Sequence, residues 1–206
     1  MGNAVHFSIA KAFNEANSKV IYFAGYKKKE DLFKQDEIEK NTDVIVYSVD
    51  SGEEIHPRRS QDKTFVGNII QAMIAYANGE LGNVEIPLNS ATRIIAIGSD
   101  RMMAAVSAAR HTTLKPFLNP KHIGIASINS PMQCMLKAIC AQCLQRHVNH
   151  ETGKEEFIFS CVKQDQCMDD VDFEHLDSRL RQNTVLEKIS NSWFDYVIEK
   201  NKVERI

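Results

Sequence analysis

The sequence predicts an α/β protein in which a doubly wound, three-layer α/β/α structure is built on a parallel sheet. The main observation is that short, unbroken apolar runs alternate along the chain with longer amphipathic segments, as buried parallel strands alternate with helices. The second observation is size, because 206 residues that are 43% hydrophobic are enough for one sizeable core with an appendage.

The elements of this α/β structure are expected in a regular order. Strands are expected at 20–24, 44–49, 94–97 and 123–128. Helices are expected at 3–17, 27–40, 65–78 and 102–109. The polar stretch 51–63 is expected to be irregular. The first visible element is a helix, so no strand precedes it.

The composition changes at Asn129, which divides the chain into an α/β domain over 1–128 and a cysteine-rich region over 129–206. The second region shows little periodicity at first, and we expect an irregular extension there. Helical spacing returns near 173–180. Thr184 and Glu187 then form a capping-box pattern that predicts a separate final helix, with most of its apolar side chains in a core.

Composition also excludes several classes of protein. The net charge of −2 gives no global field for nucleic acid or an anionic membrane. No apolar run approaches the roughly 20 residues of a membrane span, and no signal-peptide pattern is visible. Five cysteines are too few for a disulfide-dense secreted scaffold. We therefore expect a cytoplasmic protein with reduced thiols.

In an open parallel sheet, ligands bind where the carboxyl ends of the strands meet helix N-termini. In this sequence those ends are Gly25-Tyr26, Asp50-Ser51, Gly98-Ser99-Asp100 and 127–130. Gly98 allows a phosphate to approach backbone N–H groups at the positive end of a helix dipole. The alternative is a tight turn with Ser99 or Asp100 as the helix N-cap.

Two basic tracts have a similar double interpretation. Lys27-Lys28-Lys29 follows the first strand, where the ribose of an adenosine lies in such folds, so it could meet a 2′-phosphate. The more ordinary interpretation of this tract and of Arg58-Arg59 is a solvated charged face.

Four cysteines follow the last expected strand in the pattern C-x5-C-x2-C-x17-C, namely Cys134, Cys140, Cys143 and Cys161. Three thiolates in one loop and a remote fourth are similar to the plant-type [2Fe–2S] spacing, with one more residue in the first gap. A four-thiolate zinc site and unligated cysteines are the alternatives. Cys167 is then surplus.

Further motifs give the chain a resemblance to the ferredoxin-reductase-like electron-transfer subunits. Members include the iron–sulfur flavoprotein subunit of dihydroorotate dehydrogenase and the small subunit of NADH-dependent reduced ferredoxin:NADP oxidoreductase. The motifs are GNA at the start, FAGYKKKEDL, VDSGEE, IAIGSDRMMAAV, SINSPMQC and FSCVKQDQ.

This resemblance implies a nucleotide-binding sheet of the ferredoxin-reductase type and an NAD(P) site. The site residues that it implies are Gly2, Asn3, Gly25, Tyr26, Asp50, Gly98, Ser99, Asp100 and Met102. It also implies that the four cysteines hold the cluster. Ile97 stands where the family has a cysteine, and the central first strand and the flavin barrel of the family are absent. The sheet therefore has to be rearranged or completed by something else.

We expect the chain to be a fragment of an NAD(P)H-dependent flavin and iron–sulfur oxidoreductase. The FAD is expected on a missing domain, and the fragment is expected to be inactive on its own. Expected partners are a nicotinamide nucleotide, the flavin domain and a further redox subunit or electron acceptor, and self-association stays open. The alternative is a zinc-stapled nucleotide-binding or docking module. A thiol enzyme using Cys140 and Cys143 is disfavoured, because no helix N-terminus is expected at that pair.

Overall fold

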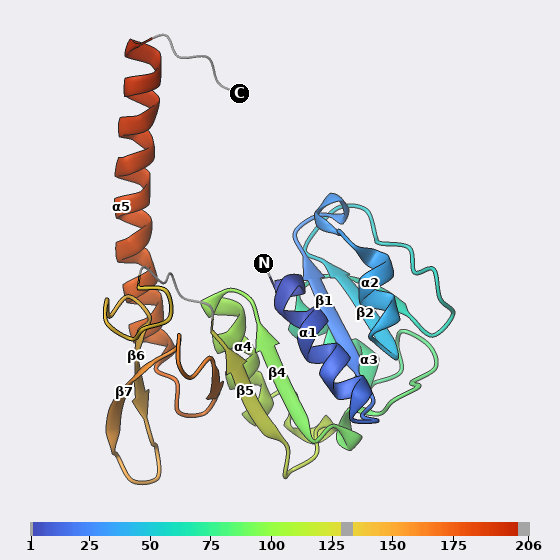
Figure 1. The fold of residues 1–206 in the computed structure, drawn as a ribbon. Coiled ribbons are helices and arrows are strands. Elements are labelled where there is room, and N and C mark those ends of the chain that lie inside the picture. The colour runs from blue at the N-terminus through green and yellow to red at the C-terminus, as the bar shows by residue number, and fades with distance from the viewer. Residues whose placement is uncertain (1, 129–133, 202–206) are drawn as a thin grey trace. The chain divides into compact units, whose positions relative to one another are not determined.

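The computed structural model describes residues 2–128 and 134–201, which belong to two compact units. Unit 1 is Met1–Ser127 and unit 2 is Ile128–Ile206 (Figure 1). No helix in the described part of the chain is both long and apolar enough to cross a membrane.

Unit 1 is the predicted α/β structure. Its elements are α1 (Gly2–Glu15), β1 (Ile21–Tyr26), α2 (Gln35–Lys40), β2 (Val44–Val49), β3 (Lys63–Val66), α3 (Ile69–Ala77), β4 (Arg93–Ile97), α4 (Asp100–His111) and β5 (Ile123–Ser127). All strand pairs within this unit are parallel. The four predicted strands are confirmed, and so is the α/β class.

Strand β2 shows why this unit has three layers, because its six residues are all buried. Val44 and Val46 pack with side chains of α3 and α4, such as Met73 and Ala109. The side chains that alternate with them point to the other face, where Ile45 lies in a cluster with residues of α1 and α2. Helices therefore cover the sheet on both faces.

The sheet of unit 1 is divided between β1 and β4. Strands β1, β2 and β3 form one parallel sheet, with β1 at its edge. Strand β4 pairs with β5 and not with β1. Among the described residues, no strand joins β1 to β4.

Two predictions about unit 1 are wrong. The stretch 27–40 is not one helix, because it holds a short 3-10 turn at Lys29–Asp31 and then only α2. Residues 63–66 are the short strand β3 and not the start of a helix. Helix α3 begins later, at Ile69, where the Asn68 side chain accepts hydrogen bonds from two backbone N–H groups of the first turn.

Unit 2 is more regular than the sequence predicts. Its elements are β6 (Leu144–Val148), β7 (Glu155–Phe159), β8 (Asp165–Cys167) and α5 (Phe173–Lys200). Strands β6 and β7 form an antiparallel hairpin. The expectation of an irregular extension is wrong for these residues, because Gln145 and His147 of β6 alternate inward.

The C-terminal part is one helix and not two. Thr184 lies inside α5, which runs without interruption from Phe173 to Lys200. The structure also overturns the burial expected for Ile189, which is 62% exposed, and Trp193 is exposed as well. The N-cap of α5 is instead Asp172, whose side chain accepts a hydrogen bond from the N–H of His175.

Candidate functional site

The hairpin of unit 2 brings two of the predicted metal ligands together. Leu144 of β6 pairs with Phe159 of β7, so the residues just beyond this pair also face each other. There the carbonyl of Cys143 accepts a hydrogen bond from the N–H of Ser160 at 3.0 Å. Cys143 and Cys161 interact through their side chains, and this raises the pKa of Cys161. Two predicted ligands with seventeen residues between them in sequence thus become neighbours.

The loop that carries the other cysteines has an unusual backbone. Four of its residues have φ between +53° and +68°, although none is glycine: Met135, Leu136, Ala138 and Ala141. Each such residue costs about 1–3 kcal/mol. Arg179 of α5 holds the loop by donating a hydrogen bond to the Ala141 carbonyl at 2.7 Å. Left-handed residues of this kind turn successive N–H groups toward one point and form anion-binding concavities.

The sulfur of Cys134 lies at the point toward which these N–H groups turn. The N–H of Ile139 donates to Cys134 Sγ at 3.5 Å. Backbone N–H groups of Cys140 and Ile139 lower the pKa of Cys134 to about 6, with further help from the Cys140 side chain and the N–H of Lys137. The loop therefore favours a thiolate at Cys134.

The side chains of the four cysteines interact, Cys134 with Cys140 and Cys161 with both Cys143 and Cys134. Within residues 2–128 and 134–201, no three His, Cys, Asp or Glu side chains converge closely enough for a single metal ion. Cys167 interacts with Asp169 and Asp170 instead, and burial raises its pKa.

The predicted nucleotide residues of β1 and β2 lie at the carboxyl edge of the sheet. Gly25 and Tyr26 are the last residues of β1 and not a loop after it, and Gly25 is exposed. Asp50 follows β2 and is also exposed, and its N–H donates to the Tyr26 carbonyl at 3.0 Å. The two strand ends are thus joined by a backbone hydrogen bond.

The turn from β4 into α4 is tightly built. Ser99 is the N-cap of α4 and its hydroxyl accepts a hydrogen bond from the N–H of Met102 at 3.2 Å. Asp100 is the first residue of the helix. A Cβ at Gly98 would lie 2.5 Å from the Met102 methyl carbon. The Met102 methyl ends a flexible side chain that can move, so this contact alone does not require glycine. The N-cap interpretation of Ser99 is confirmed.

Ser127 adds an observation at the same edge that the sequence could not give. It is the last residue of β5 and 1% exposed, and its hydroxyl has no hydrogen-bond partner within the described residues. A buried hydroxyl without a partner carries a desolvation penalty that a ligand can relieve. Residues 129 and 130 of the predicted edge lie outside the described residues. Gly2 and Asn3 are the first two residues of α1.

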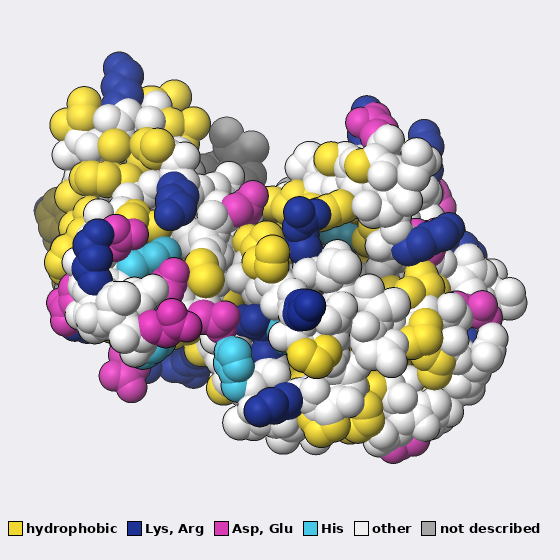
Figure 2. Space-filling view, turned by 90° about the horizontal axis from the view of Figure 1, so that it is seen from below, with side chains coloured by type: hydrophobic (Ala, Val, Ile, Leu, Met, Phe, Trp, Pro, Cys, Tyr) yellow, Lys and Arg dark blue, Asp and Glu magenta, His cyan; other side chains and the backbone are white. Residues whose placement is uncertain are grey.

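The basic tracts mainly serve structure. Arg58 contacts Asp36 and Glu39. Arg59 donates to Asp62, whose side chain is 0% exposed and also accepts from the Ile45 N–H. Lys29 pairs with Glu53 at 2.5 Å. On the face drawn in Figure 2, Lys and Arg side chains are scattered among acidic and apolar ones.

One solved structure has the same arrangement over nearly the whole chain. The chain is similar in fold to NADH-dependent reduced ferredoxin-NADP oxidoreductase, a structure described for flavin-based electron bifurcation. The match covers 94% of this chain with a TM-score of 0.65 and 23% sequence identity. This likeness shows the fold. The chain spans 58% of the length of that protein chain.

Similarity in sequence covers a smaller part of the chain than similarity in structure. A stretch of 67 residues is 48% identical to the uncharacterised protein RP006 of Rickettsia prowazekii. That stretch is 32% of this chain and only 9% of the length of the relative. No protein-family model matches the sequence.

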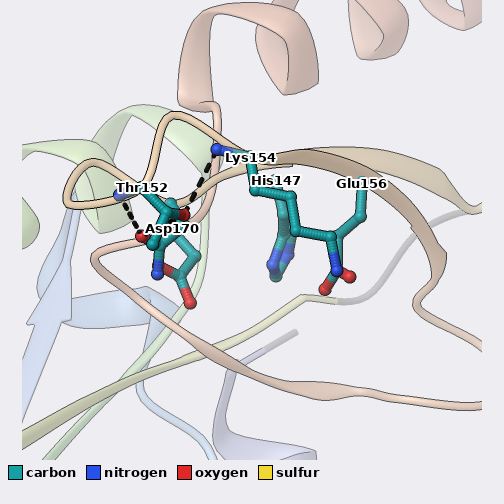
Figure 3. Close-up of a pocket in the computed structure, with 6 residues that line it drawn as sticks. His147, Thr152, Lys154, Glu156 and Asp170 are labelled. Carbon is teal, nitrogen blue, oxygen red and sulfur yellow. Dashed lines mark hydrogen bonds between the residues drawn. The ribbon is translucent and has the colours of Figure 1, made fainter.

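A polar cavity of about 230 Å³ lies at the turn of the hairpin, where the sequence predicted no site (Figure 3). Its lining residues are His147, Asn149, Thr152, Lys154, Glu156 and Asp170. The Asn149 side chain is already engaged by the N–H groups of Glu151 and Thr152. His147 is buried and its Nε2 lies 2.6 Å from Gln166 Oε1. These contacts build the turn, in agreement with an ordinary polar role for His147.

Proposed function

We propose that this chain is the nucleotide-binding and iron–sulfur part of an NAD(P)H-dependent flavin oxidoreductase. The observation that carries the proposal is the pairing of Cys134 with Cys140 and of Cys143 with Cys161, at one end of a hairpin and a strained loop. The fold likeness to an NADH-dependent oxidoreductase supports the nucleotide half.

The cysteine loop supplies what a cluster needs from the protein. Each pair provides two thiolates for one iron, and the N–H groups around Cys134 neutralise negative charge on its sulfur. The backbone strain at residues such as Leu136 and Ala138 is offset when a bound group uses those N–H groups. A [2Fe–2S] cluster would exchange single electrons there, while a flavin on a companion domain would divide the electron pair of the nicotinamide hydride.

The carboxyl edge of unit 1 supplies the nucleotide site in this proposal. The N-terminus of α4 offers free N–H groups and a positive dipole end to the pyrophosphate, with Ser99 and Asp100 at its first turn. Gly98 and Met102 shape the nicotinamide side, while Gly25, Tyr26 and Asp50 face the adenosine side. Gly2 and Asn3 complete the site at the start of α1.

The expected partners follow from the two steps of the proposed reaction, hydride transfer and single-electron transfer. The flavin domain receives hydride from the nucleotide, and a further redox subunit or acceptor exchanges electrons with the cysteine loop. The chain alone should bind nucleotide and cluster but show no turnover.

The test is anaerobic reconstitution of the purified chain with ferrous iron and sulfide. We expect visible absorption bands and about two iron atoms and two sulfides per chain. Cys134→Ser and Cys161→Ser should lose most of the absorbance, because each removes one thiolate of a pair. Cys167→Ser is the matched control and should keep it.

The outcome against the proposal is a colourless product that holds about one zinc ion per chain. That result would assign the cysteines to a structural site in a docking module. Calorimetric titration with NADH and NADPH tests the nucleotide half separately, and saturable binding that Ser99→Ala leaves unchanged would contradict the assignment of the α4 turn.

A further inference from the structure

Most of helix α5 is exposed, although it carries large apolar side chains. The helix contacts β6, and Leu176 near its start is buried. From Arg181 to Tyr196, however, every residue whose side chain the structure describes is exposed. Figure 1 shows this part of α5 extending beyond the other elements of unit 2. As far as its side chains are described, the helix is therefore buried only near its start.

Four of the exposed apolar side chains share one face of α5 and form a stripe of Val185, Ile189, Trp193 and Tyr196. Each is more than half exposed. At about 100° per residue, the four positions lie within about 80° of one another around the helix. The rings of Trp193 and Tyr196 contact each other, with centroids 5.7 Å apart. A stripe of this width is typical of a helix that packs on another element.

The exposed part of α5 also has little local support for a helix. Ser190, Asn191 and Ser192 stand in its middle, and serine and asparagine have low helix propensity. Most of the stability of helices in proteins comes from packing of an amphipathic face. We therefore expect the stripe to be covered by a partner.

The charges beside the stripe indicate which partner this is. On one flank the positive Arg181 and Lys188 come first along the chain, and the negative Asp195 and Glu199 follow. All four are exposed, and helical geometry places them on the same side, about 75–115° from the centre of the stripe. A second copy of α5 that runs in the opposite direction presents this order reversed. Its negative residues then meet the positive residues of the first copy.

We propose that the stripe is a dimer interface, in which the α5 helices of two copies of this chain pack antiparallel about a two-fold axis near Asn191. Ile189 then lies opposite the partner's Trp193, and Val185 lies opposite the partner's Tyr196. In the same register Lys188 meets the partner's Asp195. Such an interface is self-complementary, as two-fold symmetry requires.

A parallel pair of helices does not use these charges. It would bring the charged flank of one helix against the opposite flank of the other, where Ser190 and Val197 stand. In helix pairs, charges beside the apolar seam set the orientation of the partners. The separation of positive from negative residues along α5 therefore favours the antiparallel dimer.

The contact is small, which sets the expected affinity. From residue 181 to residue 199 the helix is about 27 Å long. Interfaces of this size are at the low end for specific protein contacts, so we expect a dissociation constant of about 1–100 µM. The dimer should therefore form and dissociate within the concentration range of ordinary biophysical measurements.

The experiment is sedimentation equilibrium of the full chain from about 1 to 200 µM. A reducing agent keeps the five cysteines as thiols, so that no disulfide joins the copies. We expect a monomer–dimer equilibrium in this range. Trp193 is the single tryptophan of the chain, so its emission should shift to shorter wavelength over the same concentrations as the ring leaves water.

Ile189→Glu places a charge in the middle of the stripe and should weaken the dimer at least about thirtyfold. The matched control is Phe194→Glu. Phe194 is as exposed as Ile189, but it lies about 140° from the centre of the stripe, so the dimer should keep its affinity. Both variants introduce the same side chain at an exposed position, so a general effect on the helix would appear in both.

An exchange of charges tests the orientation. Lys188 and Asp195 are chosen because Arg181 also pairs with Asp177 of its own helix at 2.7 Å. Lys188→Glu or Asp195→Lys alone should weaken the dimer about fivefold at low salt, because symmetry changes two interhelical contacts at once. The double variant should restore the affinity.

The proposal fails if the chain stays monomeric up to about 200 µM, because the stripe then belongs to a contact with another protein or with another part of the same chain. It also fails if Ile189→Glu and Phe194→Glu weaken the dimer equally, or if the double charge variant does not recover. None of these readouts depends on nucleotide or cluster binding.

Discussion

The two units of this chain are stabilised in different ways. Unit 1 is held by apolar side chains on both faces of β2, beside buried polar groups such as Asp62 and Ser127. Unit 2 buries fewer apolar side chains, such as Met168 and Leu176, and adds ion pairs in which Arg146 joins Glu155 to Asp172, while its cysteine loop has a strained backbone. An apolar core is complete without a ligand, whereas a strained loop with converging N–H groups is stabilised by one. Removal of the cluster proposed above should therefore loosen unit 2 and leave unit 1 unchanged.

The largest expected effect separates the two units by a core substitution. Leu114 is 0% exposed in the core of unit 1, so Leu114→Ala should destabilise that unit by about 2–5 kcal/mol. Urea unfolding with hydrogen exchange as the readout should show early loss of β2 and no change in the hairpin.

Leu136→Ala is the matched control in unit 2, because Leu136 is 58% exposed and should change stability by less than about 0.5 kcal/mol. Loss of protection in β6 and β7 on Leu114→Ala would mean that the units unfold together, which would break the comparison.

A smaller effect tests a buried polar side chain of unit 1, that of His6. Burial lowers the pKa of His6 to about 4, below its ordinary value of 6.5. The unfolded chain thus takes up this proton at higher pH than the folded chain. Stability should be full above pH 6.5 and fall as the pH is lowered toward 4, by at most about 3 kcal/mol.

His6→Phe keeps a ring against Tyr22 and removes the titration, so the difference in stability between variant and wild type should depend on pH in that window. A difference that stays constant from pH 7 to pH 4 would contradict the buried, neutral His6, and NMR titration of the His6 ring measures its pKa directly.

The smallest effect concerns the polar framework of unit 2. Asp172 caps α5 and forms an ion pair with Arg146 at 2.5 Å. Burial raises the pKa of Asp172, but the hydrogen bond from the His175 N–H and the contacts with Arg146 outweigh it and lower the pKa. Asp172→Ala should cost about 1 kcal/mol and increase exchange in the first turn of α5. Asp172→Asn keeps the cap and should retain most of that protection. Equal losses in the two variants would show that the charge matters more than the cap.

The sequence predicted unit 1 better than unit 2 for physical reasons. The run Val44–Val49 is apolar throughout because both of its faces are buried, so periodicity alone identifies β2. Strand β3 has only four residues and none is buried, which leaves little pattern. Thr184 and Glu187 matched a capping box, but α5 continues through them because nothing there ends a helix.

For the candidate site, the cysteine spacing predicted four ligands, and the structure brings Cys143 and Cys161 together across the end of the hairpin. The alternation of Gln145 and His147 was the available signal for the hairpin that joins Cys143 to Cys161. The left-handed residues around Cys134 have no such signal, since methionine, leucine and alanine rarely adopt that conformation. For the nucleotide edge, the role of Ser99 was foreseen, but the orphaned hydroxyl of Ser127 depends on burial that no motif encodes.

The hairpin has one more consequence, for chain length. The turn at its far end is set by Asn149 and by Gly153, whose φ is +67°. Five residues of strand separate this turn from Cys143 and Cys161, which is a distance of about 17 Å. A one-residue insertion or deletion that passed into the strands would shift the ladder, and Ser160 would no longer lie opposite Cys143. Exposed turns usually tolerate such changes, but a change in the length of this turn would be transmitted along the hairpin to the residues beside Cys143 and Cys161.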